Sequence, residues 1–284
     1  MTGTKLAGLF RLFRFELPAA AGACVVLGEL LALGGLPSFH RAASGFLCFF
    51  CISASLLILN DFFDIETDRI NAPERPLPSG VVSKGEALFL SVTVALAGFL
   101  SGFTLGADAF VVVLVVWVAG FLYNWRLKKS GLIGNLLVGF SVGMTFVFGG
   151  IAVGNPFEEV VWFLALMTMG VDLGEEIAAD ALDVEGDRRT GSRSLAVLLG
   201  PGRSMGIAAT VFGAVVASSA VPFLAGWLEW PYLPPVVFFD AIVILSARRL
   251  LDQRIPDRLN DIRRIYLCGS VMVLVFILIR LAVP

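Results

Sequence analysis

The sequence predicts an all-α polytopic membrane protein with nine transmembrane helices. Of its 284 residues, 57% are hydrophobic and only 15% are charged, and the mean hydropathy is +0.87. A soluble domain carries about 25% charged residues. Apolar segments long enough to cross a bilayer recur along the whole chain. The nine predicted spans cover residues 17–36, 42–60, 86–106, 109–125, 132–153, 159–179, 204–226, 232–249 and 263–283.

The basic residues support this count, because they alternate sharply between successive connections. One side of the membrane collects 19 of the 21 basic residues, and the opposite side keeps only Arg41 and Arg280. Basic residues collect on the cytoplasmic side of membrane proteins, so we expect a plasma-membrane protein with a cytoplasmic N-terminus, cytoplasmic loops after the second and sixth spans and an external C-terminus. The 19 basic residues expected on the cytoplasmic side are Lys5, Arg11, Arg14, Arg69, Arg75, Lys84, Arg126, Lys128, Lys129, Arg188, Arg189, Arg193, Arg203, Arg248, Arg249, Arg254, Arg258, Arg263 and Arg264.

The chain is interpreted as one domain, residues 1–284, built from two four-helix halves plus a ninth helix. Acidic clusters follow the second and sixth predicted spans, and basic ends follow the fourth and eighth. The offsets agree, at 119 residues from Asp64 to Asp183 and 122 residues from Arg126 to Arg248. An even number of spans separates the equivalent positions, so the two halves are expected to run parallel.

The first acidic cluster opens the predicted cytoplasmic loop 61–85. It reads Asn60-Asp61-Phe-Phe-Asp64-Ile-Glu66-Thr-Asp68. If the second helix continues through it, Asn60, Asp64 and Asp68 fall within roughly an 80° arc and form one oxygen-bearing stripe. Carboxylates beside a membrane helix are costly to keep, which favours a function for them.

The second acidic cluster has the same helical spacing and opens the predicted loop 180–203. Glu176, Asp180, Asp183 and Asp187 fall within roughly a 60° arc. Two such stripes suit Mg²⁺, which takes one or two carboxylates and fills its other positions with water and phosphate oxygens. The alternative, solvated acids at the membrane boundary, is preferred only for Glu74, Glu185, Asp257 and Asp261.

Basic residues near both clusters indicate a phosphorylated substrate. Their side chains suit phosphate oxygens and would neutralise the charge that builds up on a departing pyrophosphate. These residues are Arg69, Arg75, Lys128, Arg188 and Arg193. There is no basic tail and no interleaving of basic and aromatic residues, which argues against nucleic acid as a partner; no obligate protein partner is predicted.

Other acids fall inside the predicted spans. Asp172, Glu175 and Glu176 lie near the end of the sixth span and either extend the site or pair with arginines. Glu29 and Asp240 lie within the first and eighth spans, and intramembrane acids are candidates for function.

These motifs resemble those of the UbiA-type intramembrane prenyltransferases. The resemblance rests on NDFFDIETDRINAPERPLPSG at 60–80, DALDVEGDRRTGSRSL at 180–195, YNWRLKKSGLIGN at 123–135 and Arg14 before the first span. The family also has nine helices, so the resemblance covers nearly the whole chain.

The resemblance implies a set of site residues. It implies Mg²⁺ ligands at Asn60, Asp64, Asp68, Asp180, Asp183 and Asp187. It implies that Asp61, Arg14 and Tyr123 contact a polyprenyl diphosphate donor, and that Asp64, Asp68, Asp183, Asp187 and Lys128 carry catalysis; Asn135 matches a recurrent position. The reaction it implies is ionisation of an allylic diphosphate, followed by attack of an acceptor on the carbocation.

The acceptor is the most open part of this interpretation. INAPERPLPSG followed by DVEGDRRTG most resembles the archaeal branch that makes ether lipids, which transfers geranylgeranyl to the lipid-like acceptor geranylgeranylglyceryl phosphate. The alternatives are an aromatic acceptor, such as 4-hydroxybenzoate, another quinone precursor or chlorophyllide, and outside enzymes a transporter or a lipid-phosphate binding protein. A transporter would place its acids near the bilayer midplane.

Overall fold

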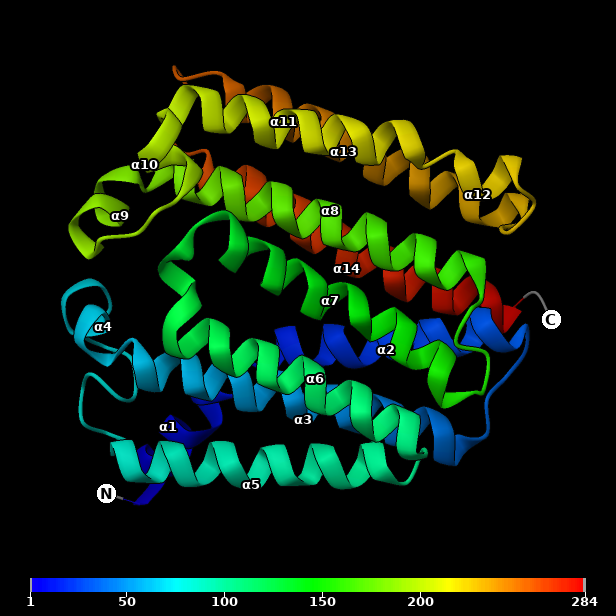
Figure 1. Cartoon of the computed structure of the whole chain (residues 1–284), viewed down its shortest axis with the longest axis horizontal. Helices are drawn as coiled ribbons and strands as arrows, with labels where there is room; N and C mark the ends of the chain where they lie inside the picture. The colour runs from blue at the N-terminus through cyan, green and yellow to red at the C-terminus, as the bar shows by residue number, and fades with distance from the viewer. Residues whose placement is uncertain (1, 283–284) are drawn as a thin grey trace.

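The computed structural model describes residues 2–282, and in that range every regular element is a helix (Figure 1). This confirms the predicted fold class. The long helices agree with the nine predicted segments to within a few residues at most ends. They are α2 (Glu16–Leu33), α3 (Phe39–Phe63), α5 (Lys84–Phe103), α6 (Ala107–Leu122), α7 (Leu132–Ala152), α8 (Glu159–Leu182), α11 (Pro201–Ser218), α13 (Leu233–Leu251) and α14 (Leu259–Ala282).

Eight of these helices within residues 2–282 are long and apolar enough to cross a membrane. The remaining one, α8, has 24 residues but carries Asp172, Glu175 and Glu176 in its second half. It packs between α7 and α11 in the bundle (Figure 1). The count of nine spans therefore depends on α8, whose carboxylates line the cavity inside the bundle.

The acidic stripes are not continuous helices, so that prediction was wrong. Helix α3 ends at Phe63, and Asp64 (φ −87°, ψ 3°) separates it from a seven-residue helix, α4 (Ile65–Asn71). Helix α8 ends at Leu182, and Asp183 (φ −115°, ψ 32°) separates it from another seven-residue helix, α9 (Val184–Thr190). Each stripe is therefore bent at its central aspartate.

The remaining short elements lie at the ends of the bundle. Helix α6 runs directly into a π-helical turn, η1 (Tyr123–Leu127), and a 3₁₀ turn, η2 (Lys128–Ser130). The others are α1 (Thr2–Leu12), α10 (Leu195–Leu199), α12 (Val221–Leu224) and η3 (Trp230–Tyr232).

The helix contacts repeat between the two halves of the chain. In the first half α3 packs against α2 and α5, and in the second half α8 packs against α7 and α11. Helix α14 contacts both α13 and α2, so the ninth long helix closes the bundle. The sequence prediction of two parallel four-helix halves plus one helix agrees with this pattern.

Glycines bring the two halves into close contact where α2 crosses α7. A Cβ atom on Gly28 would lie 2.4 Å from the carbonyl oxygen of Phe146, and one on Gly149 would lie 2.3 Å from that of Val25. Small residues allow helix backbones to approach in this way in membranes. The crossing fixes α2 and α7 beside each other, next to the central cavity.

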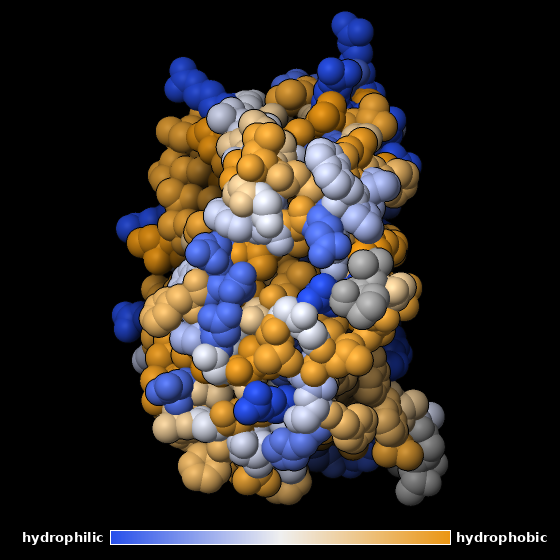
Figure 2. All heavy atoms as spheres, turned by 90° about the vertical axis from the view of Figure 1, so that its right-hand side faces the viewer, coloured by the Kyte–Doolittle hydropathy of each residue, from blue (hydrophilic) through white to orange (hydrophobic). Residues whose placement is uncertain are grey.

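The two ends of the bundle differ. The N-terminus, α4 and α9 lie at one end, whereas α12 and the C-terminus lie at the other (Figure 1). Figure 2 faces this second end, where hydrophilic residues are scattered between hydrophobic ones. Both acidic clusters therefore belong to one end of the molecule, as the sequence predicted, which argues against a transporter with acids at the midplane.

Candidate functional site

A cavity of about 750 Å³ begins at the end of the bundle that carries the acidic clusters and runs between the long helices. Its wall is mostly apolar and comes from eight long helices, α2, α3, α6, α7, α8, α11, α13 and α14. Asn60, Tyr123 and Glu176 line its polar end, whereas Leu228 and Phe276 line its other end. Such a shape suits a substrate with a charged head and a long apolar tail.

Arginines hold two carboxylates of the first cluster. Arg14, which precedes α2, donates to Asp61 at the end of α3. Arg75 donates to both oxygens of Asp68, at 2.8 Å each, and its Nη1 lies 3.9 Å from Asp61. Burial lowers and the ion pair with Asp68 raises the pKa of Arg75; the net direction is upward, so its guanidinium stays charged.

The turn after α6 holds two further members of the first cluster, Asn60 and Asp64. Lys128 donates to Oδ2 of Asp64. Asn124 accepts a hydrogen bond from Nδ2 of Asn60 at 3.0 Å and donates to the carbonyl oxygen of Leu56, also at 3.0 Å. Asn124 was not among the site residues predicted from the sequence, although it lies in the motif at 123–135.

The second cluster is less neutralised than the first. Asn135, in the first turn of α7, donates to Oδ2 of Asp180 at 3.0 Å. Asp183 is exposed, and Oδ2 of Asp187 is buried without a hydrogen-bond partner within residues 2–282. A buried carboxylate oxygen left without a partner is unfavourable unless a ligand satisfies it.

A backbone contact joins the loops of the two halves. The amide of Arg193 donates to the carbonyl oxygen of Lys129 at 2.9 Å. Gly131 adopts a φ of +66°, and a Cβ there would lie only 2.0 Å from the carbonyl oxygen of Arg193. Lys128 lies within electrostatic range of Glu176 as well as next to Asp64, so this turn stands between the two clusters.

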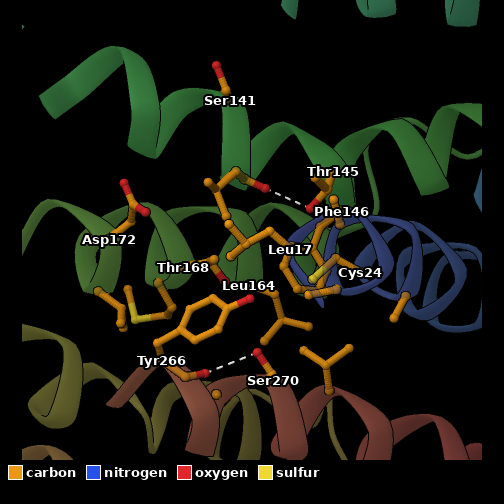
Figure 3. Close-up of a pocket in the computed structure, with 18 of the residues that line it drawn as sticks. Leu17, Cys24, Ser141, Thr145, Phe146, Leu164, Thr168, Asp172, Tyr266 and Ser270 are labelled. Carbon is orange, nitrogen blue, oxygen red and sulfur yellow. Dashed lines mark hydrogen bonds between the residues drawn. The ribbon is translucent and has the colours of Figure 1, made fainter. Parts of the chain in front are cut away.

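Carboxylates of α8 also line the cavity wall, and Figure 3 shows one of them, Asp172. Asp172 lies on α8 opposite α7, and Tyr266 reaches into the cavity from α14. One oxygen each of Asp172 and Glu175 is buried without a hydrogen-bond partner in the described chain. Asp172, Glu175 and Glu176 all line the cavity, and none forms an ion pair within residues 2–282. That they extend the site stays a prediction.

The two other intramembrane acids differ in location. Asp240 lines the cavity near its apolar end and accepts a hydrogen bond from Ser219 at 2.7 Å. Glu29 is completely buried in α2 against Gly45 of α3, away from the cavity lining.

The carboxylate and amide oxygens of the two clusters supply only part of a Mg²⁺ site by themselves. Carboxylate and amide oxygens are the ligands of a hard cation, and the unpartnered oxygen of Asp187 is free to bind one. Within residues 2–282, however, no three Asp, Glu, His or Cys side chains converge closely enough to hold a metal ion by themselves. The set therefore fits a cation that shares its coordination with a phosphorylated substrate.

Three predicted phosphate contacts form no ion pair with a proposed metal ligand within residues 2–282. Arg69 pairs with Glu66, three residues before it, at 2.9 Å. Arg188 and Arg193 are exposed, and neither side chain forms an ion pair in the described part of the chain. By contrast, Arg14, Arg75 and Lys128 lie directly on the first cluster.

Comparisons with known proteins agree with this geometry. The profile of the UbiA prenyltransferase family matches residues 21–268. Digeranylgeranylglyceryl phosphate synthase from Thermococcus kodakarensis is 36% identical over 239 residues, 84% of each chain. A solved structure of a digeranylgeranylglyceryl phosphate synthase is 28% identical with a TM-score of 0.77, over 96% of this chain and 98% of the other.

A second solved structure supports the fold alone. A UbiA homolog from Archaeoglobus fulgidus, solved bound to GPP and Mg²⁺, has a TM-score of 0.70 at 17% identity, over 96% of this chain and 99% of the other. The family match, the polytopic helical fold and the acidic clusters at the mouth of an apolar cavity lead to one conclusion: this chain belongs to the UbiA prenyltransferase family and is a membrane prenyltransferase.

Proposed function

We propose that this protein transfers a geranylgeranyl group from its diphosphate to geranylgeranylglyceryl phosphate, with Mg²⁺, in the synthesis of archaeal ether lipids. The observation that carries the proposal is the 36% identity to a digeranylgeranylglyceryl phosphate synthase across 84% of both chains. The mostly apolar cavity below the acidic clusters supports it, because both substrates join a charged head to a long apolar tail.

In this proposal the two clusters bind the cation together with the donor's diphosphate. The residues that would hold it are Asn60, Asp64, Asp68, Asp180, Asp183 and Asp187. When bound, Mg²⁺ neutralises charge on the diphosphate and makes it a better leaving group. That role fits the Archaeoglobus homolog, which was solved with both GPP and Mg²⁺.

The basic residues would then turn to the phosphates. Arg14, Arg75 and Lys128 now pair with Asp61, Asp68 and Asp64. A diphosphate beside them would offer these cations additional oxygens, with bidentate contacts from the arginines. Tyr123 would contact the donor from the cavity wall, and Arg69, Arg188 and Arg193 would meet phosphate from the loops.

The prenyl transfer needs no reactant other than the donor and the acceptor. The bond between C1 of the prenyl chain and the diphosphate oxygen breaks, and the electron pair leaves with pyrophosphate. The acceptor's glycerol oxygen forms a bond to C1, and its proton goes to the released pyrophosphate. The apolar wall shields the allylic cation from water during this exchange.

We further propose that the site faces the cytoplasm and that the membrane is the plasma membrane. The basic residues that support this orientation surround the same end of the bundle as α4 and α9, and the positive-inside rule places that end in the cytoplasm. The proposed partners are the polyprenyl diphosphate donor, the lipid-like acceptor and membrane lipids, with no nucleic acid and no obligate protein partner.

A competition assay tests the proposal. Purified protein receives Mg²⁺, geranylgeranyl diphosphate, geranylgeranylglyceryl phosphate and 4-hydroxybenzoate, and the products are identified by mass. We expect the doubly prenylated glycerol phosphate. A prenylated benzoate would replace the acceptor but keep the family's chemistry, and pyrophosphate release without either product would leave both acceptors wrong.

A further inference from the structure

Asn60 differs from the other proposed ligands because its side chain has two unlike ends. A carboxylate presents two acceptor oxygens, so either can meet a cation. An amide presents one acceptor oxygen and one NH₂ group, and the NH₂ group repels a cation. Asn60 is therefore useful to a cation only when its Oδ1 points toward the site.

The hydrogen bonds around Asn124 fix that orientation. The carbonyl oxygen of Leu56 accepts only, so Asn124 must present Nδ2 to it, at 3.0 Å. Oδ1 of Asn124 then faces Asn60, which must present its own Nδ2, again at 3.0 Å. This leaves Oδ1 of Asn60 without a donor within residues 2–282, on a side chain that lines the cavity. The orientation of both amide side chains, Asn124 and Asn60, therefore follows from the carbonyl oxygen of Leu56.

The contact belongs to a register between two parallel helices. Asn60 and Asp64 are four residues apart at the end of α3, and Asn124 and Lys128 are four residues apart after α6. Asn124 meets Asn60, and Lys128 meets Asp64, so both pairs have the same offset of 64 residues. The π-helical turn that carries Asn124 is a type of turn found frequently at functional sites.

The second half of the molecule has no counterpart to this arrangement. The residue 119 positions after Asn60 is Ala179, and Asp180 is held instead by Asn135. Only the first half places an amide among the proposed ligands, and only there is an orienting partner needed.

We propose that Asn124 is a positioning residue that holds the amide of Asn60 with its oxygen toward the cation and the donor diphosphate. The inference rests on the proposed use of Mg²⁺. Residues that orient metal ligands change metal affinity or activity by about 10–100-fold when they are replaced. Asn124 acts through Asn60, so its loss should matter only while Asn60 is present.

The test measures binding of Mn²⁺ in the presence of inorganic pyrophosphate, by the electron paramagnetic resonance signal of free Mn²⁺. The variants are Asn124→Ala, Asn60→Ala, the double variant, and Asn124→Leu, which keeps the branch at Cγ but replaces the amide oxygen and nitrogen by methyl groups. The control is Ser55→Ala, because Ser55 accepts a hydrogen bond from Trp117 at 3.2 Å and so also joins α3 to α6, outside the ligand set.

We expect Asn124→Ala and Asn124→Leu to weaken Mn²⁺ binding about 10–100-fold, to raise the Mg²⁺ concentration needed for half-maximal turnover, and to unfold near the temperature of Ser55→Ala. The double variant should bind like Asn60→Ala. Unchanged Mn²⁺ binding in both Asn124 variants would overturn the proposal, and so would additive losses in the double variant. If the variants differ from the wild type in Mn²⁺ binding as expected but the wild type forms no product, this inference stands and the proposed function is overturned.

Discussion

Asp64 and Asp183 occupy the same place in the two halves of the molecule. Each is the one non-helical residue between a long helix and a seven-residue helix, and each accepts a backbone hydrogen bond from the aspartate four residues later, at 2.8 Å for Asp68 and 3.0 Å for Asp187. The break turns each acidic stripe at its centre, so the two halves present similar carboxylate pairs at one end of the bundle.

This equivalence predicts similar effects for the two aspartates. We expect Asp64→Ala and Asp183→Ala each to lower turnover about 100-fold or more, because a lost ligand removes several kcal/mol of charge stabilisation. The measurement is pyrophosphate release with geranylgeranyl diphosphate. Glu66→Ala and Glu185→Ala are the matched controls, since these neighbouring acids are also 119 residues apart but their side chains are 71% and 66% exposed. Equal losses in the controls would contradict the assignment.

Arg14 is expected to have a structural effect that a second substitution reverses. The side chain of Asp61 is only 5% exposed, and removing Arg14 leaves this buried charge with only the more distant Arg75, at 3.9 Å, at a cost of up to about 3 kcal/mol. Arg14→Ala should therefore unfold at lower temperature than the wild type. Arg14→Ala combined with Asp61→Asn should recover most of the loss, because the buried charge is then absent. Thermal unfolding in detergent measures both, and a double variant as unstable as the single one would contradict this account.

Gly131→Ala tests the contact between the loops. The φ of +66° alone costs a non-glycine residue about 1–3 kcal/mol, and the added Cβ would displace the backbone of Arg193, which it would approach to 2.0 Å. We expect lower turnover and faster proteolysis of the loop after α9. Gly85→Ala is the control, because a Cβ there meets nothing within 4 Å and Gly85 lies in the first turn of α5. Normal activity in Gly131→Ala would show that the contact is dispensable.

Much of the fold could be predicted because apolar periodicity and basic asymmetry are local in the sequence. The breaks at Asp64 and Asp183 could not be predicted, since helical spacing is the same whether or not the helix pauses. The role of Asn124 depends on a register between α3 and α6 that sequence spacing does not contain. Arg69 pairs with Glu66, three residues earlier within α4, a spacing at which side chains on a helix are neighbours.

Metal and diphosphate are expected to bind together. Because no three acids converge within residues 2–282, Mn²⁺ alone should bind weakly, and pyrophosphate should tighten its binding by about tenfold or more, equivalent to about 1.4 kcal/mol of coupling. Calorimetric titration with and without pyrophosphate measures the difference. EDTA should abolish turnover while the unfolding temperature in the absence of substrate changes little. Tight binding of Mn²⁺ without pyrophosphate would show that the protein supplies a complete site.

The apolar end of the cavity predicts which residue limits the donor's length. Phe276 lines the cavity ten residues after Tyr266 on α14, about 15 Å deeper along the helix, and its ring packs against Tyr232 with the centroids 4.9 Å apart. Phe276→Ala removes part of that end wall. We therefore expect the product ratio to shift toward a donor one isoprene unit longer than geranylgeranyl diphosphate, by about tenfold, when both donors compete.

Phe212→Ala separates this effect from a general loss of stability. Phe212 is as buried as Phe276, at 1% exposure, but it does not line the cavity. Each truncation should cost about 3–5 kcal/mol of folding free energy, so both variants should unfold at lower temperature while only Phe276→Ala changes the product ratio. If the ratio moved equally in both, a loosened bundle rather than the end wall would explain the change, and the tail would have to extend in another direction.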